Sequence, residues 1–290
     1  MALMAPTLIS SLLIMTGSVF SQDSAAPAPP IVPVNESAKP TDEPKKFDPE
    51  ELKKSIKKIS EHEFQLGEMK LDTQTKTLRF PAALKIVKGP LEYLVVNENG
   101  SAHEALFITK VTPFELNVAM LLLGFKPSDT FFKKDGPDSF PQHVKGAPIS
   151  RESSFEVLVE WKDQDGKEQS APAESWVRNL QTSAPVSVGS WVYNASFLTE
   201  KGNLAAQEAG NVIALYIDPV ALANNPRKGN EMDDIWESKP AITKEGEPVT
   251  LAFKMAAVGA VEPTEKDADK SLPKDSSKPK VPNSKKSKSS

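Results

Sequence analysis

Side chains that carry oxygen are concentrated between residues 218 and 234 of this 290-residue chain. This stretch, called the acidic segment below, contains Asp218, Asn224, Asn225, Asn230, Glu231, Asp233 and Asp234. Ca²⁺ binds six to eight oxygen atoms from carboxylates, amides and carbonyls, so the composition of the segment suits a calcium site. The candidate metal ligands are Asp218, Asn230, Glu231, Asp233 and Asp234.

The acidic segment allows two other interpretations. Irregular turns collect Asn and Asp because these side chains hydrogen-bond to the neighbouring backbone. Alternatively, Arg227 could centre an ion pair that locks the segment. The candidate binding residues in and beside the segment are Asn224, Asn225, Arg227 and Trp236. The calcium site, the plain turn and the ion-pair lock all remain open.

A second candidate site is His103-Glu104, which we expect at the start of a strand. His103 could act as a general base if a carboxylate such as Asp233 or Asp234 approached it. Adjacent residues of a strand point to opposite faces, so we do not expect His103 and Glu104 to act as a pair. A lone histidine in this position is more often a structural residue.

Several site classes are excluded by composition and spacing. The chain has no cysteine, which excludes disulfides, iron–sulfur clusters and Cys nucleophiles. It contains no G-x-G-x-x-G motif, no phosphate-binding P-loop and no G-x-S-x-G nucleophile elbow. Asp163-Gln164-Asp165-Gly166 predicts a hairpin turn rather than a calcium loop. The tryptophans are expected either in the core or in a ligand groove: Trp161, Trp176, Trp191 and Trp236. We expect no cofactor other than Ca²⁺.

The ends of the chain differ in composition from its centre. Residues 1–21 predict a signal peptide, although no Lys or Arg precedes Lys39, and an uncleaved N-terminal anchor is the alternative. Residues 22–47 predict a Pro/Ala/Ser-rich linker, 48–262 a globular domain and 263–290 a basic disordered tail. The tail holds eight lysines and four acidic residues, without interleaved aromatics, so no nucleic-acid partner is expected. These features predict a periplasmic or secreted protein with an envelope component as its partner.

Local patterns predict two helices and several strands in the first half of the domain. Asp48-Pro49-Glu50-Glu51 has an N-cap and a proline at the first helical position, which predicts a helix ending near Ser60. Thr112-Pro113-Phe114-Glu115 repeats this chemistry before an apolar stretch that ends at Gly124, which predicts a buried helix. Strands are expected at residues 64–71 with a break at Gly67, 77–87, 91–97 and 104–109. Asn99-Gly100 between the last two predicts a central β-hairpin.

The second half predicts mostly strands. Residues 126–150 are expected to form a long loop. Strands are expected at residues 155–161, 167–170, 176–177, 191–197, 212–217 and 249–255. The fold class is therefore α+β, with a sheet-dominated body of mostly antiparallel strands and two or three short helices. The two halves are expected as two β-rich subdomains or a single body on one core.

Three segments of the chain resemble the YdjY-domain family of uncharacterised bacterial exported proteins. They are residues 80–124 (FPAALKIVKGP to LLLG), 159–180 (VEWKDQDGKEQ to RNL) and 218–236 (DPVALANNPRKGNEMDDIW). Together they cover most of residues 60–257. The resemblance implies an exported domain with these boundaries, and it implies no particular reaction.

The leading hypothesis is a non-enzymatic interaction or ligand-binding module of the cell envelope, because no catalytic motif was found. One alternative is a hydrolase, metal-assisted or not, that uses His103 and the acids between Asp218 and Asp234. Another is a structural domain stabilised by calcium.

Overall fold

The computed structural model describes residues 55–136 and 139–257. The predicted signal peptide, the linker, the basic tail and residues 48–54 of the first predicted helix lie outside these residues. Within the described part, no helix is both long enough and apolar enough to cross a membrane.

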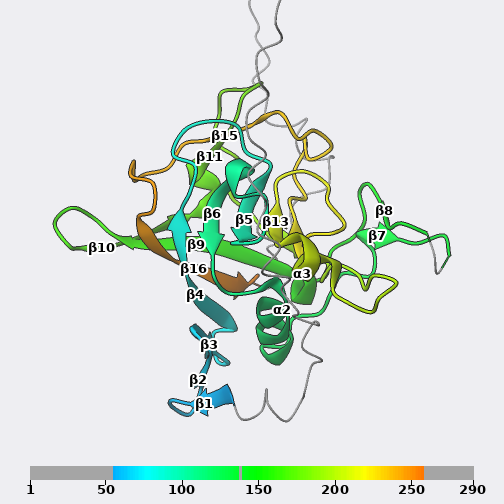
Figure 1. Cartoon of the computed structure of the whole chain (residues 1–290), viewed down its shortest axis with the longest axis horizontal. Helices are drawn as coiled ribbons and strands as arrows, with labels where there is room; N and C mark the ends of the chain where they lie inside the picture. The colour runs from blue at the N-terminus through cyan, green and yellow to red at the C-terminus, as the bar shows by residue number, and fades with distance from the viewer. Residues whose placement is uncertain (1–54, 137–138, 258–290) are drawn as a thin grey trace, which may run out of the picture. The chain divides into compact units, whose positions relative to one another are not determined.

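Eight strands form a closed, barrel-like sheet (Figure 1). Their order around the sheet is β4 (Thr77–Leu84), β16 (Pro248–Met255), β9 (Ser154–Lys162), β12 (Trp191–Tyr193), β14 (Ala223–Asn224), β13 (Asn211–Ala214), β5 (Tyr93–Asn97) and β6 (Ala105–Thr109). Pairing of β6 with β4 closes the ring. Neighbouring strands are antiparallel except for β13–β14 and β5–β6. The predicted sheet-dominated α+β fold is confirmed, and both halves of the chain contribute strands to the same sheet.

Shorter strands extend the barrel. β3 (Met69–Asp72), β2 (Glu63–Leu66) and β1 (Ile56–Lys58) continue outward from β4, and β10 (Glu168–Pro172) pairs with β9. β11 (Val177–Asn179) pairs with β15 (Trp236–Ser238), and β7 (Phe132–Lys133) pairs with β8 (Gln142–His143). The pair β7–β8 lies within the predicted long loop.

Pro81 lies where β4 changes partners. Residues 77–79 of β4 pair with β3, whereas residues 83–84 pair with β6. Pro81 stands between these two ladders, where its missing N–H removes no ladder bond, and its carbonyl accepts a hydrogen bond from Thr109 Oγ1 at 2.7 Å. The predicted bend at Pro81 is therefore a change of partner inside a sheet.

The helices are few and short in the described part. They are α2 (Pro113–Leu122), α3 (Ala205–Ala209) and the 3₁₀ helices η1 (Ala102–Glu104), η2 (Arg151–Ser153) and η3 (Ala173–Trp176). α2 begins with the predicted capping box, in which Thr112 and Glu115 bond reciprocally. The prediction that this helix is buried on nearly all sides is wrong, since Leu121 and Leu122 are 47% and 48% exposed.

Aromatic rings fill the barrel interior. Phe253 of β16 lies 4.9 Å from the ring of Phe80 in β4 and 4.9 Å from the ring of Phe155 in β9. All three side chains are buried, which indicates that they pack three adjacent strands into one core.

The predicted helix does not continue to Ser60: Ser55 is still helical, but a strand begins at Ile56. Residues 56–58 form β1, which pairs with β2 in the register Ile56 to Leu66. Ile56 packs against the core from the strand. The spacing of Ile56 and Ile59 suits a helix, but pairing with β2 satisfies the same backbone groups and lets Ile56 reach the core.

The predicted single strand over residues 64–71 is two strands. β2 and β3 form an antiparallel hairpin, and Gly67 takes a positive φ of 57° in the turn between them. The break expected at Gly67 is therefore a reversal of the chain.

The predicted hairpin around Asn99-Gly100 is also wrong, because β5 and β6 are parallel. The Asn97 Nδ2 donates to the carbonyls of Thr109, Lys110 and Val111 at the end of β6, while its Oδ1 accepts from the Asn99 N–H within the turn. Gly100 packs against Gly210, where an added Cβ would lie 2.9 Å from the Gly210 carbonyl oxygen. These contacts fix the start of the connection that leads from β5 to β6. Both strands are central in the sheet, as predicted.

The hairpin at Asp165-Gly166 is confirmed, since β9 and β10 pair across it. Asp163 Oδ1 accepts hydrogen bonds from the backbone N–H groups of Asp165 and Lys167 at 3.0 and 2.9 Å. Its Oδ2 accepts from Gln169. The Asp163 carboxylate therefore accepts the hydrogen bonds that hold this turn.

Candidate functional site

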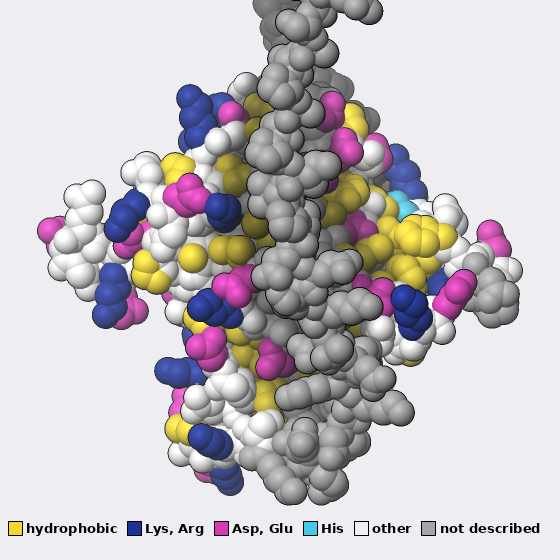
Figure 2. All heavy atoms as spheres, viewed as in Figure 1, with side chains coloured by type: hydrophobic (Ala, Val, Ile, Leu, Met, Phe, Trp, Pro, Cys, Tyr) yellow, Lys and Arg dark blue, Asp and Glu magenta, His cyan; other side chains and the backbone are white. Residues whose placement is uncertain are grey.

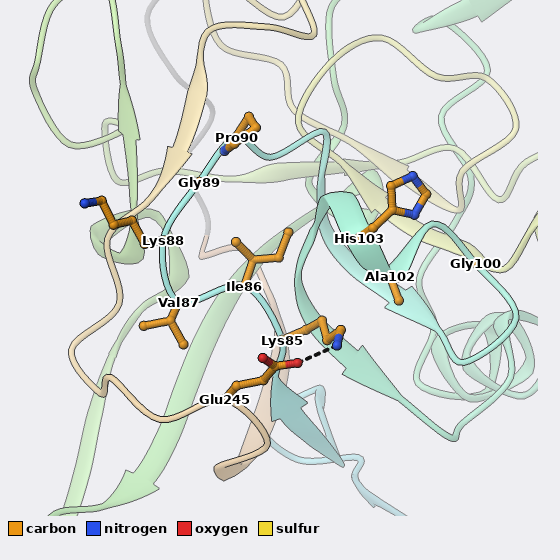
Figure 3. A pocket seen from close by; sticks show the side chains of 10 residues that line it. All are labelled: Lys85, Ile86, Val87, Lys88, Gly89, Pro90, Gly100, Ala102, His103 and Glu245. Carbon is orange, nitrogen blue, oxygen red and sulfur yellow. Dashed lines mark hydrogen bonds and ion pairs between the residues drawn. The ribbon is translucent and has the colours of Figure 1, made fainter.

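A groove of about 740 Å³ opens where β4 and β6 separate (Figure 3). Backbone pairing between the two strands ends at the hydrogen bond from Lys85 N–H to the Leu106 carbonyl, 2.8 Å long. Beyond it the chain after β4 forms one wall and the segment that includes η1 forms the other. The lining residues are Lys85, Ile86, Val87, Lys88, Gly89, Pro90, Gly100, Ala102, His103 and Glu245.

The two walls differ in chemistry. Ile86, Val87 and Pro90 make one wall mainly apolar, whereas Gly100 and Ala102 leave the opposite wall open. Lys85 pairs with Glu245 at one end of the groove, as the dashed line in Figure 3 marks. Such a mixture of apolar surface and a few polar groups is typical of ligand sites.

His103 stands at the rim of the groove, with 79% of its side chain exposed. Its Nε2 lies 3.6 Å from Glu104 Oε1. The expectation that these neighbours point to opposite faces is wrong, because both lie in the 3₁₀ helix η1 and not in a strand.

The carboxyl group of Glu92 interacts electrostatically with several of the candidate residues. Burial raises the pKa of its carboxyl group. Nearby carboxylates raise this pKa further and His103 lowers it; the carboxylates are Glu104, Asp233 and Asp218. The structure therefore brings His103 and two acids of the acidic segment into the surroundings of Glu92, which sequence reasoning did not single out.

Replacing Glu92 with glutamine should stabilise the fold at pH 7. A carboxyl group whose pKa is raised by folding favours the folded state below its unfolded pKa, about 4.3, and this contribution is lost as the pH rises through the folded pKa. We expect Glu92→Gln to raise the free energy of unfolding at pH 7 by about 0.5 kcal/mol, the scale of one like-charge contact, and to have little effect near pH 4. Urea unfolding at both pH values measures this difference. Glu98→Gln is the control, and equal gains from both variants would contradict the expectation.

Asp218 lies at the centre of a buried hydrogen-bond network. Its Oδ2 accepts from Asn211 Nδ2 at 2.9 Å and from the Tyr93 hydroxyl at 3.4 Å. Its Oδ1 accepts from the Val220 N–H at 2.8 Å. Burial raises the pKa of Asp218, and these hydrogen bonds oppose the rise. Tyr93 and Tyr216 continue the network through a 2.7 Å contact between their hydroxyls.

The asparagines of the acidic segment cross-link backbone turns. Asn224 Nδ2 donates to Asn194 Oδ1 at 2.8 Å, and its Oδ1 accepts from the Asp218 N–H at 2.7 Å. Asn225 and Asn230 donate to the carbonyls of Leu215 and Asn225, respectively. All three asparagines are buried. Their side-chain amides are therefore engaged in hydrogen bonds that join turns of the backbone.

The remaining acids of the segment lie apart from this network. Glu231, Asp233 and Asp234 are exposed, whereas Asp218 is buried. Among residues 55–136 and 139–257, no three His, Asp or Glu side chains are arranged to hold a metal ion. Calcium binding that uses amide or carbonyl oxygens stays a prediction.

Arg227 forms a buried ion pair with Glu174 of η3, with side-chain exposures of 4% and 1%. Arg227 Nη2 donates to Glu174 Oε1 at 2.6 Å and to the Gly189 carbonyl at 2.7 Å, and its Nε donates to the Ser187 carbonyl. Trp191 Nε1 donates to the same Glu174 oxygen at 2.9 Å, and the guanidinium lies over the Trp191 ring. Of the three interpretations of the segment, the described contacts fit the ion-pair lock combined with turn chemistry.

The four candidate binding residues face the interior. Asn224, Asn225, Arg227 and Trp236 are all buried, and none of them lines the groove. Trp236 Nε1 donates to the Met232 carbonyl at 3.2 Å. Their contacts hold the acidic segment in place.

Comparison with known protein families assigns the chain to one of them. The family model described as YdjY domain matches residues 69–254, which include all eight barrel strands apart from the last residue of β16. The chain belongs to the YdjY-domain family. No curated protein and no solved structure matches it significantly.

Sequence reasoning missed the partners that complete these arrangements. In the YdjY domain, Glu174 lies 53 positions from its partner Arg227, and Tyr93 lies 125 positions from Asp218, although Asn211 is only seven positions from Asp218. Lys85 and Glu245 of the groove are 160 positions apart. The local sign of a buried carboxylate was an isolated acidic residue between apolar residues, since Glu174 stands between Ala173 and Trp176-Val177.

Proposed function

We propose that this YdjY-domain protein is a non-enzymatic ligand-binding or interaction module of the bacterial cell envelope, and that the groove is its binding surface. The observation that supports this proposal is the opening of the barrel sheet between β4 and β6, which creates a concave surface lined from three separate parts of the chain.

The position of the ionisable groups favours binding over catalysis. His103 is largely exposed at the rim, and Lys85 is already paired with Glu245. Catalytic acids and bases work best where water is excluded and their partners are fixed. Groups at an open rim are better placed to contact the charged or polar parts of a ligand.

The envelope location rests on the amino-acid sequence. Residues 1–21 have the apolar character of an export signal, and the lysine-rich residues 263–290 suit weak attraction to an anionic surface such as the cell wall. The globular domain would then meet its ligand outside the cytoplasm.

Blocking the groove tests the proposal. Ala102→Trp places a large side chain on the open wall, and Val188→Trp adds the same side chain at an exposed position that does not line the groove. The full chain and both variants are sedimented with purified cell-wall sacculi and with outer-membrane vesicles at moderate salt. We expect Ala102→Trp to reduce the bound fraction at least tenfold and Val188→Trp to leave it unchanged.

All three proteins carry the same basic tail, so its contribution to sedimentation cancels. Thermal unfolding must show that both variants are folded. Equal sedimentation of all three proteins, or none by the unaltered chain, would contradict the proposal.

A further inference from the structure

A second, smaller pocket lies beside the β7–β8 hairpin and shares no lining residue with the groove. Its volume is about 160 Å³. The walls come from the expected long loop, from the chain that follows β12 and from Pro219. Figure 2 shows hydrophobic side chains gathered at this hairpin. The proposed function of the groove does not use this pocket.

Two aromatic rings line the pocket. They belong to Phe132 of β7 and to Phe197 after β12, and both side chains are half-buried. Phe140, which is 55% exposed, packs edge-on against Phe197 with ring centroids 5.6 Å apart. Aromatic side chains in such positions favour contact with another flat ring.

The pocket carries a positive charge. Lys134 is the one charged residue among the described residues that line it. The Lys134 Nζ lies 5.1 Å from the centre of the Phe197 ring. Within residues 55–136 and 139–257, Lys134 has no carboxylate partner. An ammonium group held beside aromatic rings without a counter-charge complements an anionic ligand.

The backbone after β12 adds two hydrogen-bond donors. Ala195 and Ser196 have positive φ angles of 57° and 59°, which are unfavourable for residues other than glycine. Ser196 Oγ holds this turn by donating to the Val220 carbonyl at 2.5 Å and accepting from the Ala206 N–H at 3.0 Å. In the part of the chain that the structure describes, the N–H groups of Ser196 and Phe197 have no hydrogen-bond partner. Successive unpaired N–H groups in a turn form concavities that bind anions, and strained backbone is concentrated at ligand sites.

We propose that this pocket binds a small aromatic carboxylate. The ring of the ligand packs against Phe132 and Phe197. Its carboxylate accepts hydrogen bonds from the Lys134 ammonium and from the N–H groups of Ser196 and Phe197. The volume is small compared with the usual range of about 300–1,000 Å³ for ligand pockets, so the ligand has a single ring. This site is separate from the groove, and the proposal does not depend on the function of the groove.

Three small probes separate the contributions of the ring and the charge. Benzoate has both, acetate lacks the ring and benzyl alcohol lacks the charge. Each is titrated into the ¹⁵N-labelled full chain while the amide NMR signals of Phe132, Ser196 and Phe197 are followed. We expect benzoate to shift these signals saturably with a dissociation constant of about 1 mM or lower. Acetate and benzyl alcohol should each bind at least fivefold more weakly.

Two lysine variants test the role of the charge. Lys134→Gln should lower the affinity for benzoate at least threefold and leave the affinity for benzyl alcohol unchanged. Lys133→Gln is the matched control, because Lys133 is the neighbouring residue, is equally classed as exposed and does not line the pocket. Its affinity for benzoate should stay within a factor of 1.5 of that of the unaltered chain. Both side chains are exposed, so neither change is expected to unfold the domain.

A third variant tests the aromatic wall. Phe197→Ala should weaken benzoate and benzyl alcohol alike, by at least fivefold, because it removes the surface that the ring contacts. Thermal unfolding must show that this variant is folded.

Several results would overturn the proposal. Signals that shift without saturation would mean binding at high concentration only. Equal affinities for benzoate and benzyl alcohol, or equal losses in the two lysine variants, would contradict an anion site. Saturable shifts at Ala102 and His103 in place of Ser196 and Phe197 would assign the ligand to the groove and overturn the second pocket.

Discussion

Replacing Glu174 with alanine is expected to lower the free energy of unfolding by about 3–5 kcal/mol, because it leaves the Arg227 guanidinium buried without its counter-charge. Arginine does not lose its proton in proteins, so the charge cannot be relieved. For a domain of this size the loss corresponds to a decrease in Tm of roughly 6–20 °C. Thermal and urea unfolding measure it.

The opposite variant should be less costly at low pH. Burial raises the pKa of Glu174 while Arg227 opposes the rise, so removal of Arg227 raises this pKa further. In Arg227→Met the carboxyl can take up a proton, and the loss of stability should therefore be smaller at pH 5 than at pH 8. The Glu174→Ala loss should not shrink in this way.

The double variant Glu174→Leu/Arg227→Met is the matched control. It removes both charges and fills the space with apolar side chains, which is often neutral for a buried ion pair. We expect it to recover most of the stability lost in either single change. Additive losses in the double variant would show that the two charges do not stabilise each other.

A second large effect is expected at Gly210, where Gly210→Ala should lower the free energy of unfolding by more than about 4 kcal/mol or prevent folding. Gly210 ends α3 with a φ of 74°, and its carbonyl accepts the Asn97 N–H at 2.7 Å. An added Cβ would lie 2.4 Å from the Gly100 nitrogen and 2.6 Å from the Gly100 Cα. Backbone atoms cannot rotate away as a flexible side chain could, so the turn before β13 would separate from the turn after β5.

Gly202→Ala is the control that measures the cost of a left-handed backbone conformation without a steric clash. Gly202 has nearly the same φ, 78°, but a Cβ there would meet nothing within 4 Å. Its substitution should cost only about 1–2 kcal/mol, the usual penalty for an L residue in the left-handed region. Similar stabilities of the two variants, measured by urea unfolding, would contradict a close contact between Gly100 and Gly210.

Local chemistry made several elements predictable. The capping box of Thr112 and Glu115 defines the start of α2, and Asp165-Gly166 defines the turn between β9 and β10, because the groups involved are neighbours in sequence. Asn99-Gly100 has an equally strong local pattern and gave a wrong prediction. The turn itself forms, with the Gly100 N–H donating to the Asn97 carbonyl at 2.8 Å, but β5 and β6 do not pair across it, because the Asn97 side chain and the contact with Gly210 hold the connection in another path.

The site shows the same division. His103, Glu104 and the acidic segment could be selected from the sequence because their side chains can bind protons or ions. Their positions in the fold could not be predicted from the sequence. The buried ion pair joins residues 53 positions apart, and the groove exists because β4 and β6 separate after Lys85.

The sequence by itself therefore determined the family, the sheet-dominated class of the fold and most of its strands, since hydrophobic alternation and capping act over a few residues. Only the tertiary structure decided that β5 and β6 run parallel, that Arg227 pairs with Glu174 and that a groove opens beyond the last bond between β4 and β6. The reason is physical. Each of these features depends on which distant backbone or side-chain group reaches a given position when the barrel closes, and no local pattern encodes that choice.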